Sequence, residues 1–180
     1  MKLRRTIPQT LNDISVEDYL HIKNIMTTFK DDDAKILKKM TDYYFEESSI
    51  KESSQMIAKT LEIFGTEPRF IQRFEYRNVE YGFIPNLEEI TTAEYIDIDD
   101  YQKDENAIAE MMAILYRPIT VKDKKGNYQI APYKGTSDEQ IELMKKVSVE
   151  IYLGAMVFFW ELNKDLLVAV DIYTKKDKKK

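Results

Sequence analysis

Hydrophobic residues recur every three or four positions along three stretches near the start of the chain. The stretches cover residues 16–29, 31–45 and 55–64, and each is followed by a charged residue or a glycine. This spacing gathers the hydrophobic side chains on one face of a helix, so we predict three amphipathic helices. Ser53 or Ser54 is expected to cap the third helix, because a serine hydroxyl accepts a hydrogen bond from an amide of the first turn.

Two later stretches alternate hydrophobic and polar residues, which is typical of strands with one buried face. Residues 70–84 alternate around the pair Arg77-Asn78, and residues 119–133 alternate around Gly126. Glycine and asparagine favour tight turns because they tolerate a left-handed backbone. Each stretch is therefore predicted to form a β-hairpin.

Further helices are predicted in the second half of the chain. One begins near Lys103 and stops before Pro118, since proline disfavours helix at the residue that precedes it. Ser137 caps the next helix, and Ser148 begins a last helix that extends to about Tyr173. The first half of this last helix is hydrophobic on nearly every side, so we expect it to lie at the centre of the fold or against a partner.

These elements together predict an α+β fold in which helices dominate. We expect about six helices, two or three short β-hairpins and a long, central C-terminal helix. Residues 1–174 are predicted to form a single compact domain, followed by a basic tail at residues 175–180. The longest hydrophobic run covers residues 151–160. As a helix it spans about 15 Å, half of a bilayer core, so no membrane span is expected.

Two stretches of the chain repeat nearly the same pattern. With one gap, residues 7–22 align with residues 84–98 through an Ile-Pro pair, a leucine and a hydroxyl residue that precedes an acid by three positions. A hydroxyl and an acid at this spacing form the capping box of a helix start. Each copy is therefore predicted to form a strand, a turn and a capped helix, with Ser15 and Thr91 as the caps. An internal duplication and convergence on one strand-to-helix turn explain the match equally well.

Composition limits the class of protein further. The chain has 180 residues, with twelve Tyr, eight Phe and no Cys. The aromatic content indicates a folded chain, and the lack of cysteine excludes disulfides, thiolate catalysis and cysteine-based zinc sites. The net charge of −5 argues against a general nucleic-acid-binding protein.

The C-terminal tail is basic although the whole chain is acidic. Basic tails contact phosphates or acidic proteins, so this tail is a candidate contact for DNA or for an acidic partner. A solvated terminus that keeps the protein in solution is the alternative. The residues concerned are Lys175, Lys176, Lys178, Lys179 and Lys180.

Few residues offer candidate chemistry. His21 is the only histidine, and a surface position on a helix is a simpler interpretation than a catalytic triad assembled by the fold. The best metal candidates are Asp97, Asp99 and Asp100, yet a calcium loop would need a glycine where Gln102 stands. A magnesium site is the alternative to solvated acids. No glycine lies in a phosphate-binding motif, and we assign no catalytic, cofactor-binding or metal-binding residue.

Several large side chains suit a protein–protein interface. Buried aromatic anchors dominate the energetics of interfaces, although the core of the chain is the usual place for such residues. Arg117 is expected to stabilise the end of a helix or to pair with a carboxylate. The candidate interface residues are Met111, Met112, Met156, Phe158, Phe159 and Trp160.

Three stretches together resemble a known group of proteins. They are YGFIPNLEEI at residues 81–90, running into EYID at 94–97, then AILYRPI at 113–119 and GAMVFFW at 154–160. Their order is similar to that in small proteins encoded among the virion and morphogenesis genes of tailed bacteriophages, including the crAss-like phages of Bacteroidetes. The resemblance covers roughly residues 7–167 and brings no catalytic motif with it.

The resemblance implies a component of the phage particle or a protein needed to assemble it. We expect a virion protein of the tail or head–tail region that acts by protein–protein contacts in multiple copies and is not an enzyme. Its implied partners are portal, tail or tape-measure proteins, other copies of the chain and packaged DNA, with no membrane and no cofactor. The implied location is the virion, after assembly in the host bacterial cytoplasm. A tail assembly chaperone that does not stay in the mature particle is the alternative.

Overall fold

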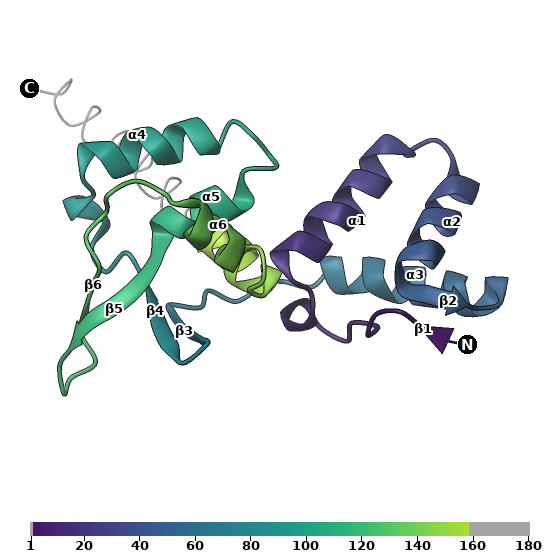
Figure 1. The fold of residues 1–180 in the computed structure, drawn as a ribbon, viewed down its shortest axis with the longest axis horizontal. Coiled ribbons are helices and arrows are strands. Elements are labelled where there is room, and N and C mark those ends of the chain that lie inside the picture. Colours follow the sequence, from purple (N-terminus) through teal and green to yellow (C-terminus); the bar gives the residue numbers. More distant parts are fainter. Residues whose placement is uncertain (1, 159–180) are drawn as a thin grey trace, which may run out of the picture.

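The computed structural model describes residues 2–158, which form helices, two 3₁₀ turns and short strands (Figure 1). The α-helices are α1 (Val16–Thr28), α2 (Asp33–Tyr44), α3 (Ile50–Phe64), α4 (Thr92–Tyr101), α5 (Ile108–Leu115) and α6 (Asp138–Met144). A further helix covers residues 149–158. The 3₁₀ turns are η1 (Leu11–Asp13) and η2 (Leu87–Glu89). The strands are β1 (Lys2–Leu3), β2 (Phe45–Glu47), β3 (Arg73–Tyr76), β4 (Val79–Phe83), β5 (Tyr116–Lys122) and β6 (Tyr128–Ile130).

The predicted α+β class is confirmed, but the number of helices is corrected. The described part of the chain contains seven α-helices where about six were expected. The helix predicted from Lys103 begins only at Ile108, because Asp104 accepts a hydrogen bond from the amide of Asn106 at 2.9 Å and so favours a turn. The predicted extension of the last helix to Tyr173 lies outside residues 2–158.

Both predicted hairpins are confirmed, and they join into one antiparallel sheet with the strand order β3-β4-β5-β6. The first hairpin turns at Arg77 and Asn78, whose φ angles of 51° and 63° are left-handed. The second turns at Gly126, whose φ angle is 89°. Gly82 of β4 pairs with Arg117 of β5 in the middle of the sheet. Arg117 therefore lies in a strand, and the expectation that it stabilises the end of a helix is wrong.

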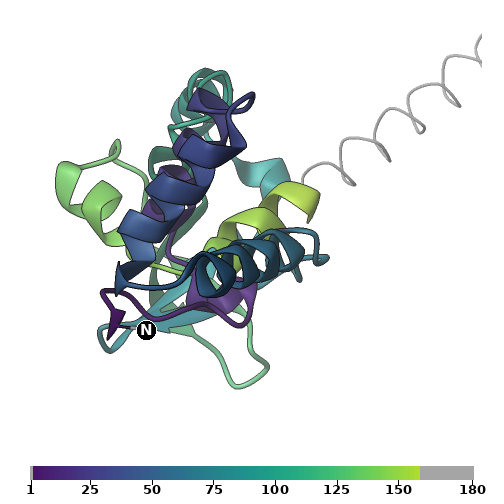
Figure 2. The same cartoon turned by 90° about the vertical axis from the view of Figure 1, so that its right-hand side faces the viewer.

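The elements are arranged in two lobes (Figures 1 and 2). Helices α1–α3 with strands β1 and β2 form the helical lobe, which faces the viewer in Figure 2. The four-stranded sheet, α4–α6 and the helix at 149–158 form the sheet lobe. The core of the helical lobe includes Ile22, Met40 and Met56. The larger core of the sheet lobe includes Met112 and Leu115, and Val16 from the start of α1 also belongs to it.

Backbone hydrogen bonds join the two lobes. The amide of Val16 at the start of α1 donates to the carbonyl of Val147 at 2.9 Å. The amide of Val149 donates to the carbonyl of Ile14 at 2.8 Å. Val149 also packs with Ile14 and Ile63 in a small third core. The first repeat is thus fixed between α3 and the helix at 149–158.

The two repeated stretches adopt the same local structure. In each, a 3₁₀ turn, an isoleucine and a hydroxyl cap lead into a helix, which is α1 in the first copy and α4 in the second. Ser15 Oγ accepts a hydrogen bond from the amide of Asp18 at 3.0 Å. Thr91 Oγ1 accepts one from the amide of Glu94 at 3.3 Å. The predicted turns and caps are confirmed, whereas a strand leads directly into the repeat only in the second copy, where β4 precedes it.

Helix α3 begins earlier than its hydrophobic pattern predicts. Ser49 is the cap, because its hydroxyl accepts from the amide of Glu52 at 3.3 Å while the Glu52 carboxylate accepts from the amide of Ser49 at 2.8 Å. The predicted cap Ser53 is buried within α3 and shares a hydrogen bond of 2.7 Å with Ser48. The capping box of Ser49 and Glu52 satisfies two backbone amides at once, so the helix begins there and not at the predicted caps Ser53 or Ser54.

Replacing Ser49 by alanine is expected to lower the free energy of unfolding by about 1 kcal/mol, since the first turn of α3 loses its acceptor. Ser54→Ala, at an exposed position of the same helix, is the matched control and should change that energy by less than about 0.5 kcal/mol. Urea unfolding followed by circular dichroism measures both variants. Equal effects of the two substitutions would contradict Ser49 as the cap.

Candidate functional site

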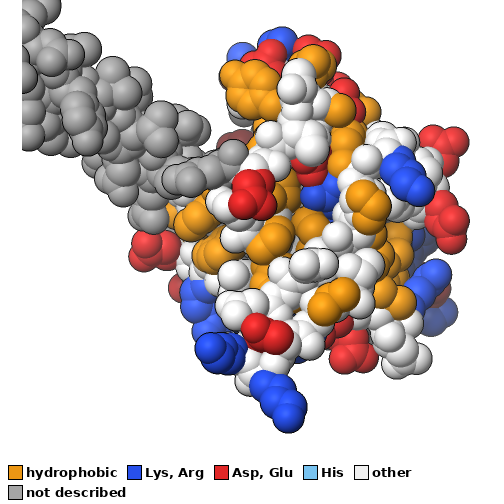
Figure 3. Space-filling model, turned by 90° about the vertical axis from the view of Figure 1, so that its left-hand side faces the viewer, with side chains coloured by type: hydrophobic (Ala, Val, Ile, Leu, Met, Phe, Trp, Pro, Cys, Tyr) orange, Lys and Arg blue, Asp and Glu red, His pale blue; other side chains and the backbone are white. Residues whose placement is uncertain are grey.

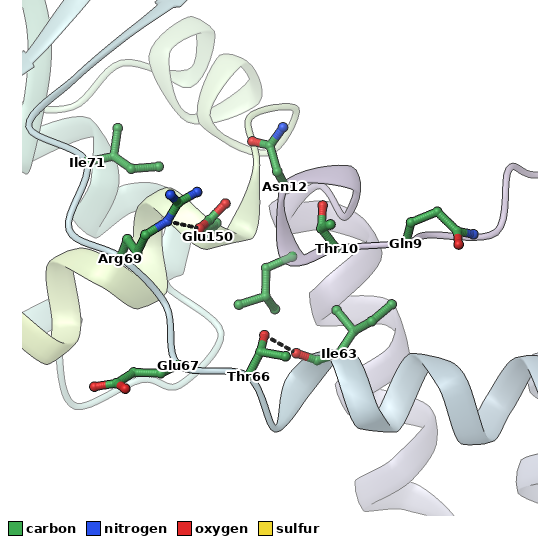
Figure 4. A pocket seen from close by; sticks show the side chains of 10 residues that line it. Gln9, Thr10, Asn12, Ile63, Thr66, Glu67, Arg69, Ile71 and Glu150 are labelled. Atoms are coloured by element: carbon green, nitrogen blue, oxygen red, sulfur yellow. Dashed lines mark hydrogen bonds and ion pairs between the residues drawn. The ribbon is translucent and has the colours of Figure 1, made fainter.

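An open cleft lies where the two lobes meet (Figure 4), and its volume is about 480 Å³. Its walls are the first repeat, the end of α3 with the chain that follows it, and the start of the helix at 149–158. Ligands often bind between lobes or domains, so this cleft is the first candidate site. The lining residues are Gln9, Thr10, Leu11, Asn12, Ile63, Thr66, Glu67, Arg69, Ile71 and Glu150.

One ion pair lies in this cleft. Arg69 Nε is 3.5 Å from Glu150 Oε1, and the Glu150 side chain is largely buried whereas that of Arg69 is exposed. Glu67 adds a second carboxylate to the lining, and Figure 4 shows Thr10 and Asn12 on the wall formed by the first repeat. The cleft can therefore hold a polar group by hydrogen bonds to amide, hydroxyl and carboxylate side chains.

A second hollow, the α2–α3 groove, lies on the helical lobe and has a volume of about 360 Å³. Hydrophobic side chains dominate its lining, and one of them, Leu61, is 41% exposed. Hydrophobic surface that is open to solvent favours contact with another hydrophobic surface. The residues that define the groove are Met26, Asp33, Ile36, Leu37, Ser54, Ile57, Ala58 and Leu61.

A buried ion pair connects the second repeat to the sheet. Arg117 Nη2 lies 2.5 Å from Glu94 Oε1, and the two side chains are only 7% and 6% exposed. Glu94 Oε2 also accepts from the amide and the hydroxyl of Thr91, at 2.8 and 2.6 Å. Within residues 2–158, Nε and Nη1 of Arg117 are buried without a hydrogen-bond partner. Because a buried charge is costly unless it is paired, Glu94 is essential to the burial of Arg117.

The first repeat carries a similar cluster nearer the surface. Asp18, the acid of its capping motif, accepts hydrogen bonds from Arg5 Nη1 at 3.1 Å and from the hydroxyl of Tyr43. Arg5 Cζ lies 4.3 Å from the centroid of the Tyr43 ring, and Arg117 Cζ lies 5.6 Å from that of Tyr133. Burial and the hydrogen bond to Asp18 raise the pKa of Tyr43, so this hydroxyl stays protonated and keeps donating. Each repeat thus joins an arginine, an acid and a tyrosine at a helix start.

The pKa of Glu94 is lowered in the folded chain. Burial raises it, but the hydrogen bonds from Thr91 and the positive charge of Arg117 outweigh the burial. A carboxylate of lowered pKa contributes stability above its unfolded pKa of about 4.3, and this contribution is lost as the pH falls through the folded pKa.

The difference in unfolding free energy between the wild type and Glu94→Gln is therefore expected to shrink as the pH falls from about 6 to about 3. Urea unfolding at a series of pH values measures it. The comparison cancels the contributions of the other carboxylates, which both chains share. A difference that stays constant across this range would show that ionised Glu94 does not stabilise the fold.

The three acids proposed as metal candidates have separate partners. Asp97 accepts a hydrogen bond from the hydroxyl of Tyr133. Lys103 Nζ lies 2.7 Å from Asp99 Oδ2 and 3.1 Å from Asp100 Oδ1. Among residues 2–158, no group of three or more His, Cys, Asp or Glu side chains is placed to hold a metal ion. These acids serve as partners of a tyrosine and a lysine.

His21 and Arg117 are placed by different kinds of contact. His21 lies exposed on α1, as expected, and its ring stacks on that of Tyr43 with 4.2 Å between the centroids. Arg117 pairs with a carboxylate, which was the second of the two expectations for this residue.

Four of the six candidate interface residues lie in the described part of the chain. Met111 and Met112 are 6% and 0% exposed, because the sheet lobe encloses α5, so their assignment to an interface is corrected. Met156 and Phe158 are partly buried against the same core, and the Phe158 ring stacks on Phe70 with centroids 4.4 Å apart. Outside the described residues lie Phe159, Trp160, Lys175, Lys176, Lys178, Lys179 and Lys180.

Sequence reasoning missed both hollows. Arg69 lies in the loop after α3 and Glu150 lies in a later helix, and no periodicity links two residues so far apart in the chain. The residues of the α2–α3 groove belong to the predicted hydrophobic faces of their helices. A hydrophobic pattern shows which face is apolar but not which part of that face the fold leaves uncovered.

The chain matches no family model, no curated protein and no solved structure. None of the helices within residues 2–158 combines the length and the hydropathy needed to cross a bilayer. The hollows and clusters described above are therefore the basis for a functional proposal.

Proposed function

We propose that this chain is a structural component of a tailed bacteriophage particle, in the tail or head–tail region. It acts by protein–protein contacts in multiple copies and not by catalysis. The observation that carries the proposal is the α2–α3 groove, a mostly hydrophobic hollow of about 360 Å³ that is open to solvent. Such a surface is stabilised when another chain covers it. The resemblance of residues 81–90, 113–119 and 154–160 to small phage proteins supplies the biological setting.

A second surface supports a protein that contacts several neighbours. Figure 3 shows one face of the molecule, where hydrophobic side chains lie among uncharged ones across the middle and most charged side chains stand towards the edge. A hydrophobic centre with a polar rim is the usual anatomy of a protein interface. Large hydrophobic residues are also exposed on separate elements, including Tyr95 and Val121, with exposed fractions of 65% and 56%.

The proposed partners are portal, tail or tape-measure proteins and further copies of the chain. The proposed location is the virion, after assembly in the cytoplasm of the host bacterium. Contact between the tail at residues 175–180 and packaged DNA stays a prediction, since the tail lies outside the described residues.

A tail assembly chaperone is the second candidate, and the α2–α3 groove favours it as well. A chaperone of this kind holds a hydrophobic segment of its client, and a groove between helices is suited to an amphipathic helix. The two candidates differ in whether the protein stays in the finished particle.

Mass spectrometry of purified particles, compared with lysates of infected cells, tests the proposal. We expect peptides of this chain to be retained in gradient-purified particles in proportion to the portal protein. A replication protein of the same phage is the control, since purification should remove it. Peptides found in the lysate but lost from particles would overturn the structural function and support the chaperone.

A further inference from the structure

We propose that the α2–α3 groove of one copy binds residues 159–173 of a second copy. The inference rests on the proposed function, because it explains how a multi-copy protein links its copies. It draws on the chemistry of the groove, the sequence beyond residue 158 and the direction of the helix at 149–158.

The α2–α3 groove has the lining that a helix with one hydrophobic face requires. Leu37 of α2 and Ile57 and Leu61 of α3 contribute to its walls, and Met26 of α1 also lines it. Amphipathic helices bind in such grooves through hydrophobic residues spaced three or four positions apart. With α1–α3 already packed together, a fourth helix in this position would complete a helical bundle.

The sequence beyond residue 158 predicts such a helix. The last helix is predicted to extend to about Tyr173, and hydrophobic residues recur in this segment at helical spacing. The segment 159–173 has the same length as α3, which has 15 residues. Its hydrophobic stripe consists of Phe159, Leu162, Leu166, Ala169 and Tyr173.

Charge complements the hydrophobic match and orients the segment. The segment is followed by the basic tail at residues 175–180. The α2–α3 groove has Asp33 in its lining, and Asp31 stands exposed just before α2. Opposite charges at one end of a groove fix the direction of a bound helix. The tail then lies beside the start of α2, and the segment runs antiparallel to that helix.

The direction of the helix at 149–158 favours a second copy over the same chain. Val149 packs against Ile63 at the edge of the helical lobe. Phe158, nine positions later in the chain, packs against Phe83 of β4 and against Phe70 in the loop before β3. A helix that continues in this direction leads away from the α2–α3 groove of its own copy. Two different surfaces then meet between copies, and such a heterologous contact builds rings or filaments.

Disulfide trapping in the full-length chain tests the inference, because the chain has no cysteine of its own. Leu61→Cys places a thiol in the α2–α3 groove, and Ala169→Cys places one on the hydrophobic stripe. We expect the two variants, mixed and oxidised, to form a dimer that contains one of each, since docked residues can reach the Cα separation of about 4.4–6.8 Å that a disulfide needs. Ile50→Cys, on an exposed site of the same lobe, replaces Leu61→Cys in the control mixture.

The expected yield of mixed dimer is at least about fivefold above the control, on a non-reducing gel with the linked peptide identified by mass spectrometry, because productive exchange needs lasting access between the two thiols. A yield equal to the control overturns the inference. A Leu61→Cys/Ala169→Cys double variant that forms its disulfide within one chain also overturns the inference. The segment would then occupy the α2–α3 groove of the same copy.

Sedimentation velocity measures self-association independently of the disulfide. We expect the wild type to self-associate, Leu61→Asp to shift to the monomer, and Ile50→Asp to behave as the wild type. Self-association that survives Leu61→Asp also overturns the inference. If the protein is retained in particles but no mixed dimer is trapped, this contact is wrong and the proposed function stands. If the mixed dimer is trapped but the protein is absent from particles, the contact stands and the proposed function is wrong.

Discussion

Replacing Glu94 by alanine is expected to lower the free energy of unfolding by about 3–5 kcal/mol, which is the cost of breaking a buried ion pair from one side. The substitution removes the carboxylate that pairs with the buried Arg117 guanidinium, whose Nε and Nη1 have no hydrogen-bond partner among residues 2–158. It also removes the acid of the capping box at Thr91. Urea unfolding at neutral pH measures the change.

Two variants separate this effect from a general cost of losing an acid. Asp99→Ala, whose carboxylate pairs with Lys103 at the surface, is expected to leave the stability nearly unchanged, because water screens that pair. The double variant Glu94→Met/Arg117→Met should recover most of the loss, since hydrophobic side chains of similar volume tolerate burial. A Glu94→Ala variant as stable as Asp99→Ala would rule out the buried pair as a determinant of stability.

Gly154→Ala is expected to destabilise the fold by about 1–3 kcal/mol, the usual cost of forcing an extra methyl group into a packed site. A Cβ at this position would overlap the carbonyl oxygen of Arg69 and lie 2.7 Å from its carbonyl carbon. Both atoms belong to the backbone and cannot rotate away as a side chain can. The direction of the change in unfolding free energy is informative, because alanine in place of glycine within a helix otherwise stabilises a protein by about 1 kcal/mol.

The same helix offers a control for this prediction. Val157→Ala, at a site that is 37% exposed, should change the free energy of unfolding by less than about 0.5 kcal/mol. Thermal unfolding of both variants beside the wild type gives the comparison. A Gly154→Ala chain that unfolds at a higher temperature than the wild type would show that the helix at 149–158 does not approach the Arg69 backbone this closely.

The elements that sequence reasoning predicted well depend on local chemistry. The turn at Arg77 and Asn78 and the caps at Ser15, Thr91 and Ser137 involve residues within a few positions of each other. Such interactions are visible in a short window of sequence. The same local competition explains the errors, since the capping box at Ser49 extended α3 beyond its hydrophobic pattern.

The candidate site could not be predicted in the same way. The burial of Glu94 and Arg117 depends on the start of α4 meeting β5, and the close approach at Gly154 depends on a loop from a distant part of the chain. From the sequence alone, Glu94 is predicted only to be the acid of a capping box. The two hollows appear only when the faces of several helices are placed against one another.

The hydrogen bonds that join the two lobes can form only late in folding. Ser148 Oγ donates to the carbonyl of Leu11 across 137 positions of sequence, beside the backbone bonds of Val16 and Val149. On the ribosome, the first repeat can make these hydrogen bonds only after the segment at residues 147–149 has been synthesised, long after helices α1–α3. Contacts of such long range slow folding, so the hydrophobic surface of the early helices stays open to other molecules during synthesis.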